Sequence, residues 1–218
     1  MYFHNRAEAG EQLARQMVDA YRYENVAVVA LSDGAVAVGE PIAERLHCIL
    51  TLLISEKVEV PGESQTLGAV SQAGTFTHNS DLSGSEIGEY ENEYHGYFEE
   101  QKREALHRIN RLIGDGGVIS HDLLQGHTIV LVSDGLNDAT SLDVAMDFLK
   151  PVQTQRLVIA TPIASVAMVD KVHMIADELH ILDVKANYLD TNHYYDQNDL
   201  PSHEETIDKI NKIILNWR

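Results

Sequence analysis

Two Ser-Asp-Gly turns, at residues 32–34 and 133–135, carry the side chains best suited to chemistry in this chain. Each turn follows an aliphatic run and precedes an amphipathic one. Ligands of parallel α/β sheets bind beyond the carboxyl ends of the strands, where such turns lie. We therefore expect both turns to border one crevice, and the aspartate in each gives that crevice a negative charge.

The segments around these turns predict a parallel α/β sheet. Residues 26–31 and 128–132 are uninterrupted aliphatic runs, as in strands that are covered on both faces. Further strands are expected at 48–54, 156–160 and 180–184, and further helices at 6–21, 165–176 and 204–217. The predicted fold class is α/β, with a Rossmann-like parallel sheet flanked by helices, in one domain over residues 1–218.

The middle of the chain, residues 55–100, interrupts this pattern. Its aliphatic runs stop, and Gly, Ser, Thr, Asn and acidic residues dominate. We expect a short hairpin at 66–77, although its glycines weaken that prediction, and a long helix at about 85–113 that ends at the glycine-rich segment 114–117. Long polar excursions in compact domains are often functional, so a flexible lid and an inert loop both stay open.

Composition narrows the classes of partner. The chain has 34 acidic and 16 basic side chains, a formal charge of −18, which disfavours nucleic acid and anionic membranes as partners. Its single cysteine, Cys48, lies in an apolar run and is expected to fill the core. The beginning of the chain lacks a signal-peptide pattern, and no apolar run approaches the length of a membrane helix. We expect a soluble, cytoplasmic protein.

The order of segments resembles the type I phosphoribosyltransferases over nearly the whole chain. The similarity is closest to a bacterial branch whose opening helix carries Arg-x-x-Ala-Gly, here Arg6, Ala9 and Gly10. The stretches VVALSDGAVAVGEPIA, HTIVLVSDGLNDATSLDVAMDFLK and TPIASVAMVDKVHMIADELHIL align with that branch in order. The resemblance implies a small C-terminal hood at 180–200, phosphoribosyl pyrophosphate (PRPP) as substrate, magnesium as cofactor, and a homodimer.

In this family, the turn after the central strand holds PRPP. Two acids bind the ribose hydroxyls, and a glycine-rich turn at the start of a helix binds the 5-phosphate. The resemblance assigns this loop to Ser133, Asp134, Gly135, Leu136, Asn137, Asp138, Ala139, Thr140 and Ser141. It makes Asp134 the catalytic acid and makes Asp134 and Asp138 candidate magnesium ligands. However, Ser133 replaces the first acid, Asp138 replaces a threonine, and Ala139 replaces a glycine, so the motif is degenerate.

The residues on the pyrophosphate side also differ from the family pattern by loss of positive charge. Ser32, Asp33 and Gly34 stand where the family has Arg-Gly-Gly, and Glu56 with Lys57 stands where it has Arg-Lys. Lys57 is therefore the best remaining candidate for a pyrophosphate contact. Each new acid alone is explained as a helix cap, whereas the set together favours a functional change.

The hood residues implied by the resemblance are Tyr188, His193, Tyr194, Tyr195 and Asp196. Aromatic rings at these positions would stack on an acceptor base, and Asp196 would accept a hydrogen bond from it. The alternative is a polar loop in which the tyrosines pack internally. The sequence leaves both interpretations open.

Three functions follow from these residues. The first is a phosphoribosyltransferase-like binding or regulatory protein with weak or absent transfer activity. The second is an active transferase that uses magnesium and transfers phosphoribose to an unidentified, nucleobase-like acceptor. The third is an acidic protein that binds a basic partner. For the first two, the expected ligand is a small phosphorylated sugar or a nucleotide. A phosphatase of the haloacid dehalogenase type is disfavoured, because Leu31 stands where its nucleophilic aspartate would be.

Overall fold

A computed structural model of the chain describes residues 2–63, 65–113, 121–198 and 200–216. The described residues fall into two compact units. The first unit is drawn from residues 2–52, 121–137, 152–198 and 200–216, and the second from residues 53–63, 65–113 and 138–151. The predicted glycine-rich stop at 114–117 lies outside the described residues.

The first unit contains a five-stranded parallel sheet in the order β2-β1-β6-β7-β8. Its strands are β1 (Val26–Ala30), β2 (Ile49–Leu52), β6 (Thr128–Val132), β7 (Arg156–Ser165) and β8 (Glu178–Lys185). Every residue of β1 and β6 is buried, and the two strands pair in parallel with Val28 opposite Val130. The aliphatic runs therefore form the centre of the sheet, as predicted.

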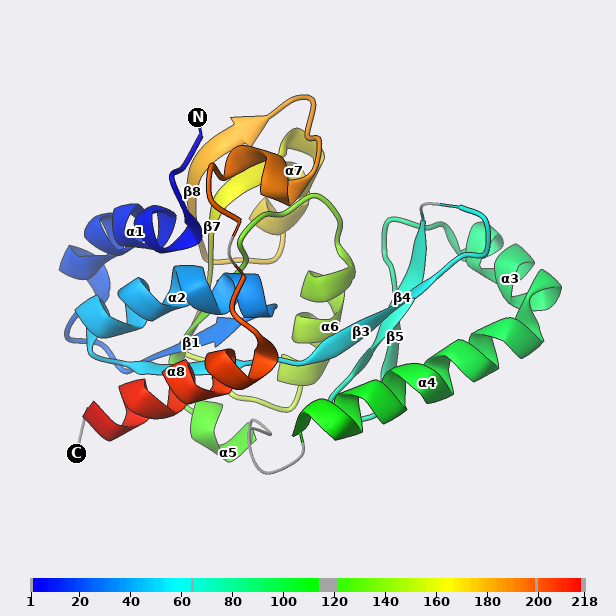
Figure 1. Cartoon of the computed structure of the whole chain (residues 1–218), viewed down its shortest axis with the longest axis horizontal. Coiled ribbons are helices and arrows are strands. Elements are labelled where there is room, and N and C mark those ends of the chain that lie inside the picture. The colour runs from blue at the N-terminus through cyan, green and yellow to red at the C-terminus, as the bar shows by residue number, and fades with distance from the viewer. Residues whose placement is uncertain (1, 64, 114–120, 199, 217–218) are drawn as a thin grey trace. The chain divides into compact units, whose positions relative to one another are not determined.

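Helices flank this sheet (Figure 1). They are α1 (Arg6–Tyr21), α2 (Asp33–Leu46), the short α5 (His121–Leu124), α7 (Val166–His173) and α8 (His203–Asn216), with the 3-10 turn η1 at Thr191–Tyr194. Asn5 caps α1 by accepting a hydrogen bond from the Glu8 amide. Gly10 of α1 lies against the Val38 carbonyl of α2, so that a side chain at position 10 would overlap the backbone of α2. These helices confirm the α/β fold class.

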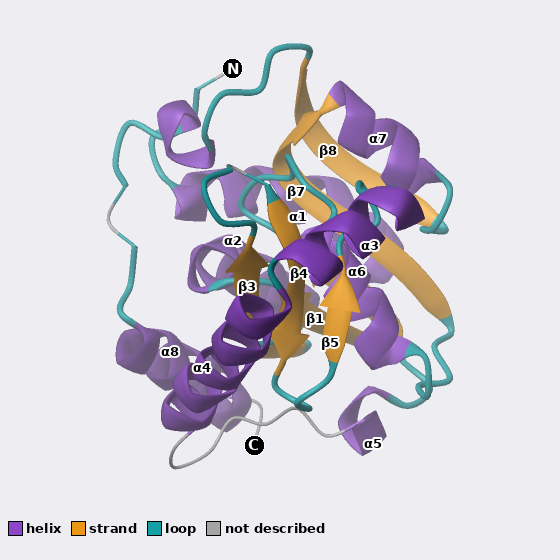
Figure 2. Ribbon diagram, turned by 90° about the vertical axis from the view of Figure 1, so that its right-hand side faces the viewer, coloured by secondary structure: helices purple, strands orange, loops and turns teal. Residues whose placement is uncertain are grey.

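The second unit contains a three-stranded antiparallel sheet in the order β3-β4-β5 (Figure 2). Its elements are β3 (Ser55–Glu59), β4 (Thr66–Ser71), β5 (Phe76–His78), α3 (Gly84–Glu93), α4 (His95–Ile113) and α6 (Thr140–Leu149). Lys57, Ala69 and Thr77 are aligned across the sheet. Because side chains alternate along a strand, their face is opposite to that of Glu56 and Phe76.

The two faces of this small sheet meet different helices. Thr77 donates a hydrogen bond to Asp147 of α6. On the other face, Glu56 binds Arg108 of α4 at 2.9 Å, and the Lys102 ammonium lies 4.4 Å from the centre of the Phe76 ring. The three strands are therefore sandwiched between α4 and α6.

The segment from 55 to 100 holds more regular structure than its composition suggested. The hairpin expected at 66–77 is confirmed by β4 and β5. Gly68, whose presence weakened that prediction, is needed there because a Cβ atom would overlap the Thr77 carbonyl. The expected helix at 85–113 is divided at Tyr94 into α3 and α4, and Ser83 and Glu86 form a capping box at the start of α3.

Cys48 is buried, and burial raises the pKa of its thiol to about 12, as expected of a core residue. Within the described ranges, the helices are too short or too polar to cross a lipid bilayer.

Candidate functional site

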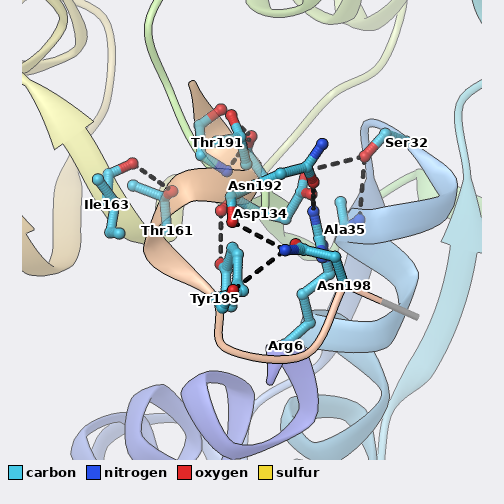
Figure 3. Close-up of polar contacts among 12 residues, drawn as sticks. Arg6, Ser32, Ala35, Asp134, Thr161, Ile163, Thr191, Asn192, Tyr195 and Asn198 are labelled. Atoms are coloured by element: carbon cyan, nitrogen blue, oxygen red, sulfur yellow. Dashed lines mark hydrogen bonds and ion pairs between the residues drawn. The ribbon is translucent and has the colours of Figure 1, made fainter. Parts of the chain in front are cut away.

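Asp134, in the turn after β6, forms a buried ion pair with Arg6 at the start of α1. Arg6 Nε lies 2.7 Å from Asp134 Oδ2, and the Ser32 hydroxyl donates to Asp134 Oδ1 over 3.1 Å (Figure 3). The side chains of Arg6 and Asp134 are only 4% and 15% exposed. Both carboxylate oxygens of Asp134 therefore have protein partners.

Arg6 is held by more than this carboxylate. One terminal nitrogen donates to Asn192 Oδ1 over 2.7 Å and the other to Asn198 Oδ1 over 3.3 Å. The guanidinium also stacks on the Tyr195 ring, 4.4 Å from its centre, and the Tyr195 hydroxyl donates to the Asp134 carbonyl over 2.6 Å. Such saturation compensates for the loss of water around a buried charge.

The backbone of the same turn is also engaged. The Ser133 hydroxyl donates to the Gly135 carbonyl and accepts from the Gly135 amide. Leu136 extends the pairing with β7, because its amide donates to Ile163 and its carbonyl accepts from Ser165. The amides of Gly135 and Leu136 are therefore used within the fold.

Asp138 begins the part of the predicted loop that belongs to the second unit. Its Oδ2 lies 2.7 Å from the Lys57 ammonium, and its Oδ1 accepts from the Thr140 amide over 3.0 Å. Burial alone would raise the pKa of Asp138, but the Lys57 charge and the hydrogen bonds from Lys57 and Thr140 outweigh it and lower the pKa below its usual value. Lys57, predicted to contact pyrophosphate, is thus paired with an acid of this chain.

The remaining loop residues divide between the two units. Asn137 is exposed at the end of the first unit, whereas Ala139 and Thr140 are buried and Ser141 is half-buried at the beginning of α6. The Ala139 amide donates to Asp81 Oδ2 over 3.0 Å.

The first Ser-Asp-Gly turn acts as a helix cap and as a neighbour of Asp134. Ser32 accepts from the Ala35 amide and so caps α2. Asp33 Oδ1 lies 3.1 Å from Nδ1 of His203, the first residue of α8. A Cβ atom at Gly34 would overlap the Asp134 carboxylate. The structure thus brings Ser32, Gly34 and Asp134 together, while a ligand crevice bordered by both turns stays a prediction.

Of the hood residues, Tyr188 and Tyr195 contact the Asp134 turn, and the hood tyrosines are largely packed. Tyr194 and Tyr195 are each 3% exposed and belong to a core cluster with Phe3, Ala9 and Ile163. Tyr188 bonds to Thr191, and burial raises its pKa to about 12.

Two other hood residues lie nearer the surface. The His193 ring bonds to the Tyr2 hydroxyl. The exposed Asp196 donates its amide to the Phe3 carbonyl. Packing within the fold is thus the better supported interpretation of the hood tyrosines, while a base contact from His193 or Asp196 stays a prediction.

The two candidate magnesium ligands do not fit a metal held by the protein. Asp134 and Asp138 are each engaged by a cationic side chain and a second donor. Over the residues that the structure describes, histidine, cysteine and carboxylate side chains form no cluster of three that could hold a metal ion. Binding of magnesium by these acids would require at least one ion pair to break.

Comparison with known proteins decides the family. The phosphoribosyl transferase domain family matches residues 2–196. The chain belongs to the phosphoribosyl transferase domain family. TT1426 from Thermus thermophilus has a similar crystal structure, with 24% identity and a TM-score of 0.71 over 100% of this chain and 99% of that one. The AQ2163 protein from Aquifex aeolicus has 11% identity and a TM-score of 0.50 over 84% of this chain and 74% of that one.

In this member of the phosphoribosyl transferase family, the sequence does not predict the roles of two residues, Arg6 in the first unit and Asp81 in the second. The sequence places Arg6 in an opening motif without revealing its partner, although a charged side chain that is buried is expected to be paired. Asp81 lies 58 positions before Ala139, and nothing in its local sequence marks it.

Proposed function

We propose that this protein is a phosphoribosyltransferase-like binding or regulatory protein with a degenerate PRPP loop, and that its transfer activity is weak or absent. The observation that carries the proposal is the pairing of Asp134, the acid aligned with the ribose-binding position, with Arg6 and Ser32. Ribose hydroxyls would have to displace Arg6 from a buried ion pair. Breaking such a pair costs about 3–5 kcal/mol, which corresponds to a loss of roughly two to four orders of magnitude in affinity.

The phosphate side supports the same proposal. Asp138 stands where the family has threonine, and its carboxylate already accepts a hydrogen bond from the Thr140 amide. A carboxylate within about 4–6 Å of a phosphate dianion is repelled by roughly one to several kcal/mol. Because Lys57 is paired with Asp138, its positive charge is already partly neutralised.

The proposal also covers the cofactor, the cellular location and the oligomeric state. Magnesium has no ready ligand set among the described residues, because Asp134 and Asp138 are each paired with a cationic side chain. We place the protein in the cytoplasm and expect the homodimer implied by the bacterial branch with the Arg6, Ala9 and Gly10 motif. An active transferase remains the competing function, and it requires that PRPP displace both Arg6 and Lys57 from their acids.

Calorimetric titration with PRPP, with and without magnesium, tests this proposal. We expect no binding by the wild-type chain at micromolar concentrations. Micromolar binding, together with release of pyrophosphate when nucleobases are added, would establish the active transferase instead. The double variant Asp138→Thr/Ala139→Gly restores the family pattern on the phosphate side and should gain PRPP affinity. Equal affinities of this variant and the wild type would refute the repulsion argument.

A further inference from the structure

We propose that the Asp81 carboxylate occupies the anion-binding position at the beginning of α6 and so excludes phosphate from it. This inference rests on the proposed function, because it explains how a loop of this family is closed to its usual ligand. It assigns the role to a residue outside the PRPP loop. All the residues that carry the argument belong to the second unit.

Two consecutive amides at the start of α6 donate to carboxylates of this chain. The Ala139 amide donates to Asp81 Oδ2, and the Thr140 amide donates to Asp138 Oδ1, each over 3.0 Å. Amides at a helix N-terminus, together with the helix dipole, are the groups that bind phosphate in many proteins. Here two carboxylate oxygens accept the hydrogen bonds that phosphate oxygens would accept.

α6 lacks a cap from its own N-cap residue. Ala139 holds the N-cap position without a side-chain hydrogen bond. By contrast, α1, α2, α3 and α7 are each capped by their own residues, which are Asn5, Ser32, Ser83 and Ser165. The acceptor for the Ala139 amide is therefore Asp81, from a distant part of the chain. The helix concerned, α6, is the one whose N-terminus aligns with the family's phosphate-binding turn.

The turn that carries Asp81 is fixed on the small sheet by Asn79. This asparagine is 6% exposed, its amide side chain donates to the Thr66 carbonyl over 3.0 Å, and its Oδ1 accepts from the Asp81 amide over 3.0 Å. The Asn79 backbone amide also donates to the Leu67 carbonyl. Asp81 is therefore presented by a turn with a defined conformation.

The same turn is also fastened to α6. The Ser80 amide and hydroxyl donate to the Asp143 carboxylate over 2.8 and 2.7 Å. Asp143 lies one helical turn after Ala139, and its amide donates to the Ala139 carbonyl. The Ser80 contact thus holds Asp81 beside the first amides of the helix, and an incoming anion would have to displace the whole turn.

Charge strengthens this exclusion. The acids nearest the Ala139 and Thr140 amides are Asp81 and Asp138, Asp143 follows in the first turn of α6, and the Lys57 ammonium is paired with Asp138. A phosphate dianion at the Ala139 and Thr140 amides would meet the carboxylates of Asp81 and Asp138. Removing one nearby like charge should raise its affinity by about tenfold.

The test is a titration of the full chain with inorganic phosphate, followed by the NMR shifts of the Ala139 and Thr140 amides. The variants are Asp81→Ala, Asp81→Ala/Asp138→Ala and, as a control, Asp147→Ala, which removes an acid from the same helix at a site away from these amides. We expect no saturable shift in the wild type or the control. Asp81→Ala should shift the Ala139 amide saturably, and the double variant should bind phosphate about tenfold more tightly than Asp81→Ala.

Asp81→Asn guards against misfolding, because it keeps an oxygen acceptor for Ala139 and removes the charge. It should bind phosphate more tightly than the wild type. Absence of a saturable shift in the folded Asp81 variants, or an equal shift in the wild type, would overturn the inference. If the wild type rejects PRPP while the Asp81 variants also reject phosphate, the role of Asp81 fails and the proposed function stands. If the wild type binds and turns over PRPP, the proposed function itself fails.

Discussion

Arg6 Nε and Asp134 Oδ2 lie 2.7 Å apart in a buried ion pair that joins the first helix of the chain to the turn after the central strand β6. The pair makes this turn part of the folded core of the first unit. It also engages the acid that relatives of this chain are expected to present to ribose. The Arg6–Asp134 ion pair therefore contributes both to the stability of the fold and to the proposed loss of transfer activity. Substitutions at either residue should affect stability.

Replacing Arg6 by methionine should strongly destabilise the protein. Asp134 would keep the Ser32 hydrogen bond but lose its cationic partner, and Asn192 and Asn198 would lose theirs. An uncompensated buried charge costs about 3–5 kcal/mol. Urea unfolding measures the change in the free energy of unfolding.

Arg45→Met is the matched control. Arg45 pairs with Glu11 at 2.6 Å, but their side chains are 42% and 37% exposed. Exposed ion pairs contribute about 0–1 kcal/mol. Similar losses from Arg6→Met and Arg45→Met would contradict the account of a buried, structurally essential pair.

Glycine-to-alanine substitutions at positions 34 and 88 should change the free energy of unfolding in opposite directions. A Cβ atom at Gly34 would overlap the Asp134 carboxylate and come within 3.0 Å of Arg6 Nε, whereas Gly88 in α3 has open space around it. Gly34→Ala should destabilise by about 1–3 kcal/mol, and Gly88→Ala should stabilise by about 0.5–1 kcal/mol. Thermal unfolding distinguishes the two, and stabilisation by Gly34→Ala would show that the Asp134 turn is less tightly packed than described.

Tyr195→Phe should cost about 1 kcal/mol of stability. It removes the hydroxyl that donates to the Asp134 carbonyl over 2.6 Å while keeping the ring that stacks on Arg6. Tyr23, which is 93% exposed, provides the control substitution Tyr23→Phe. Equal unfolding midpoints for the two variants would argue against a structural role for the Tyr195 hydroxyl.

The stability contributed by Asp138 should depend on pH. Its pKa is lowered in the folded state, with Lys57 and Thr140 outweighing burial. A lowered folded pKa means that the contribution is complete above the unfolded pKa of about 4 and disappears as the pH falls through the folded pKa. The difference in unfolding free energy between wild type and Asp138→Asn should therefore shrink from neutral pH to strongly acidic pH. A difference that stays constant with pH would show that the Lys57 pair does not set this pKa.

The strands and helices of the first unit could be predicted from sequence because their signals are local. The runs that form β1 and β6 are wholly buried and almost entirely aliphatic, and the Ser-Asp-Gly turns after them mark where α2 and the Asp134 turn begin. The second unit gave weaker signals. In β3 only Val58 is buried, and Glu56 and Lys57 point to opposite faces of a three-stranded sheet, so this strand lacks the apolar alternation that identifies a strand.

The candidate site could be predicted only in part, for a related reason. The approach of Ser32 and Gly34 to Asp134 follows from the parallel pairing of β1 and β6. The partners that satisfy the site, Arg6 and Asp81, come from segments far away in the chain, and such contacts depend on how the elements pack. An acidic turn is visible in sequence, whereas the cation or amide that binds each acid is not.

The most direct test of the central claim is a crystal structure of the wild-type protein soaked with PRPP and magnesium. We expect Arg6 Nε to stay within hydrogen-bond distance of Asp134 and no phosphoribosyl group to be seated on that acid. A ribose whose hydroxyls bind Asp134, with Arg6 displaced and the 5-phosphate on the Ala139 and Thr140 amides, would contradict the account.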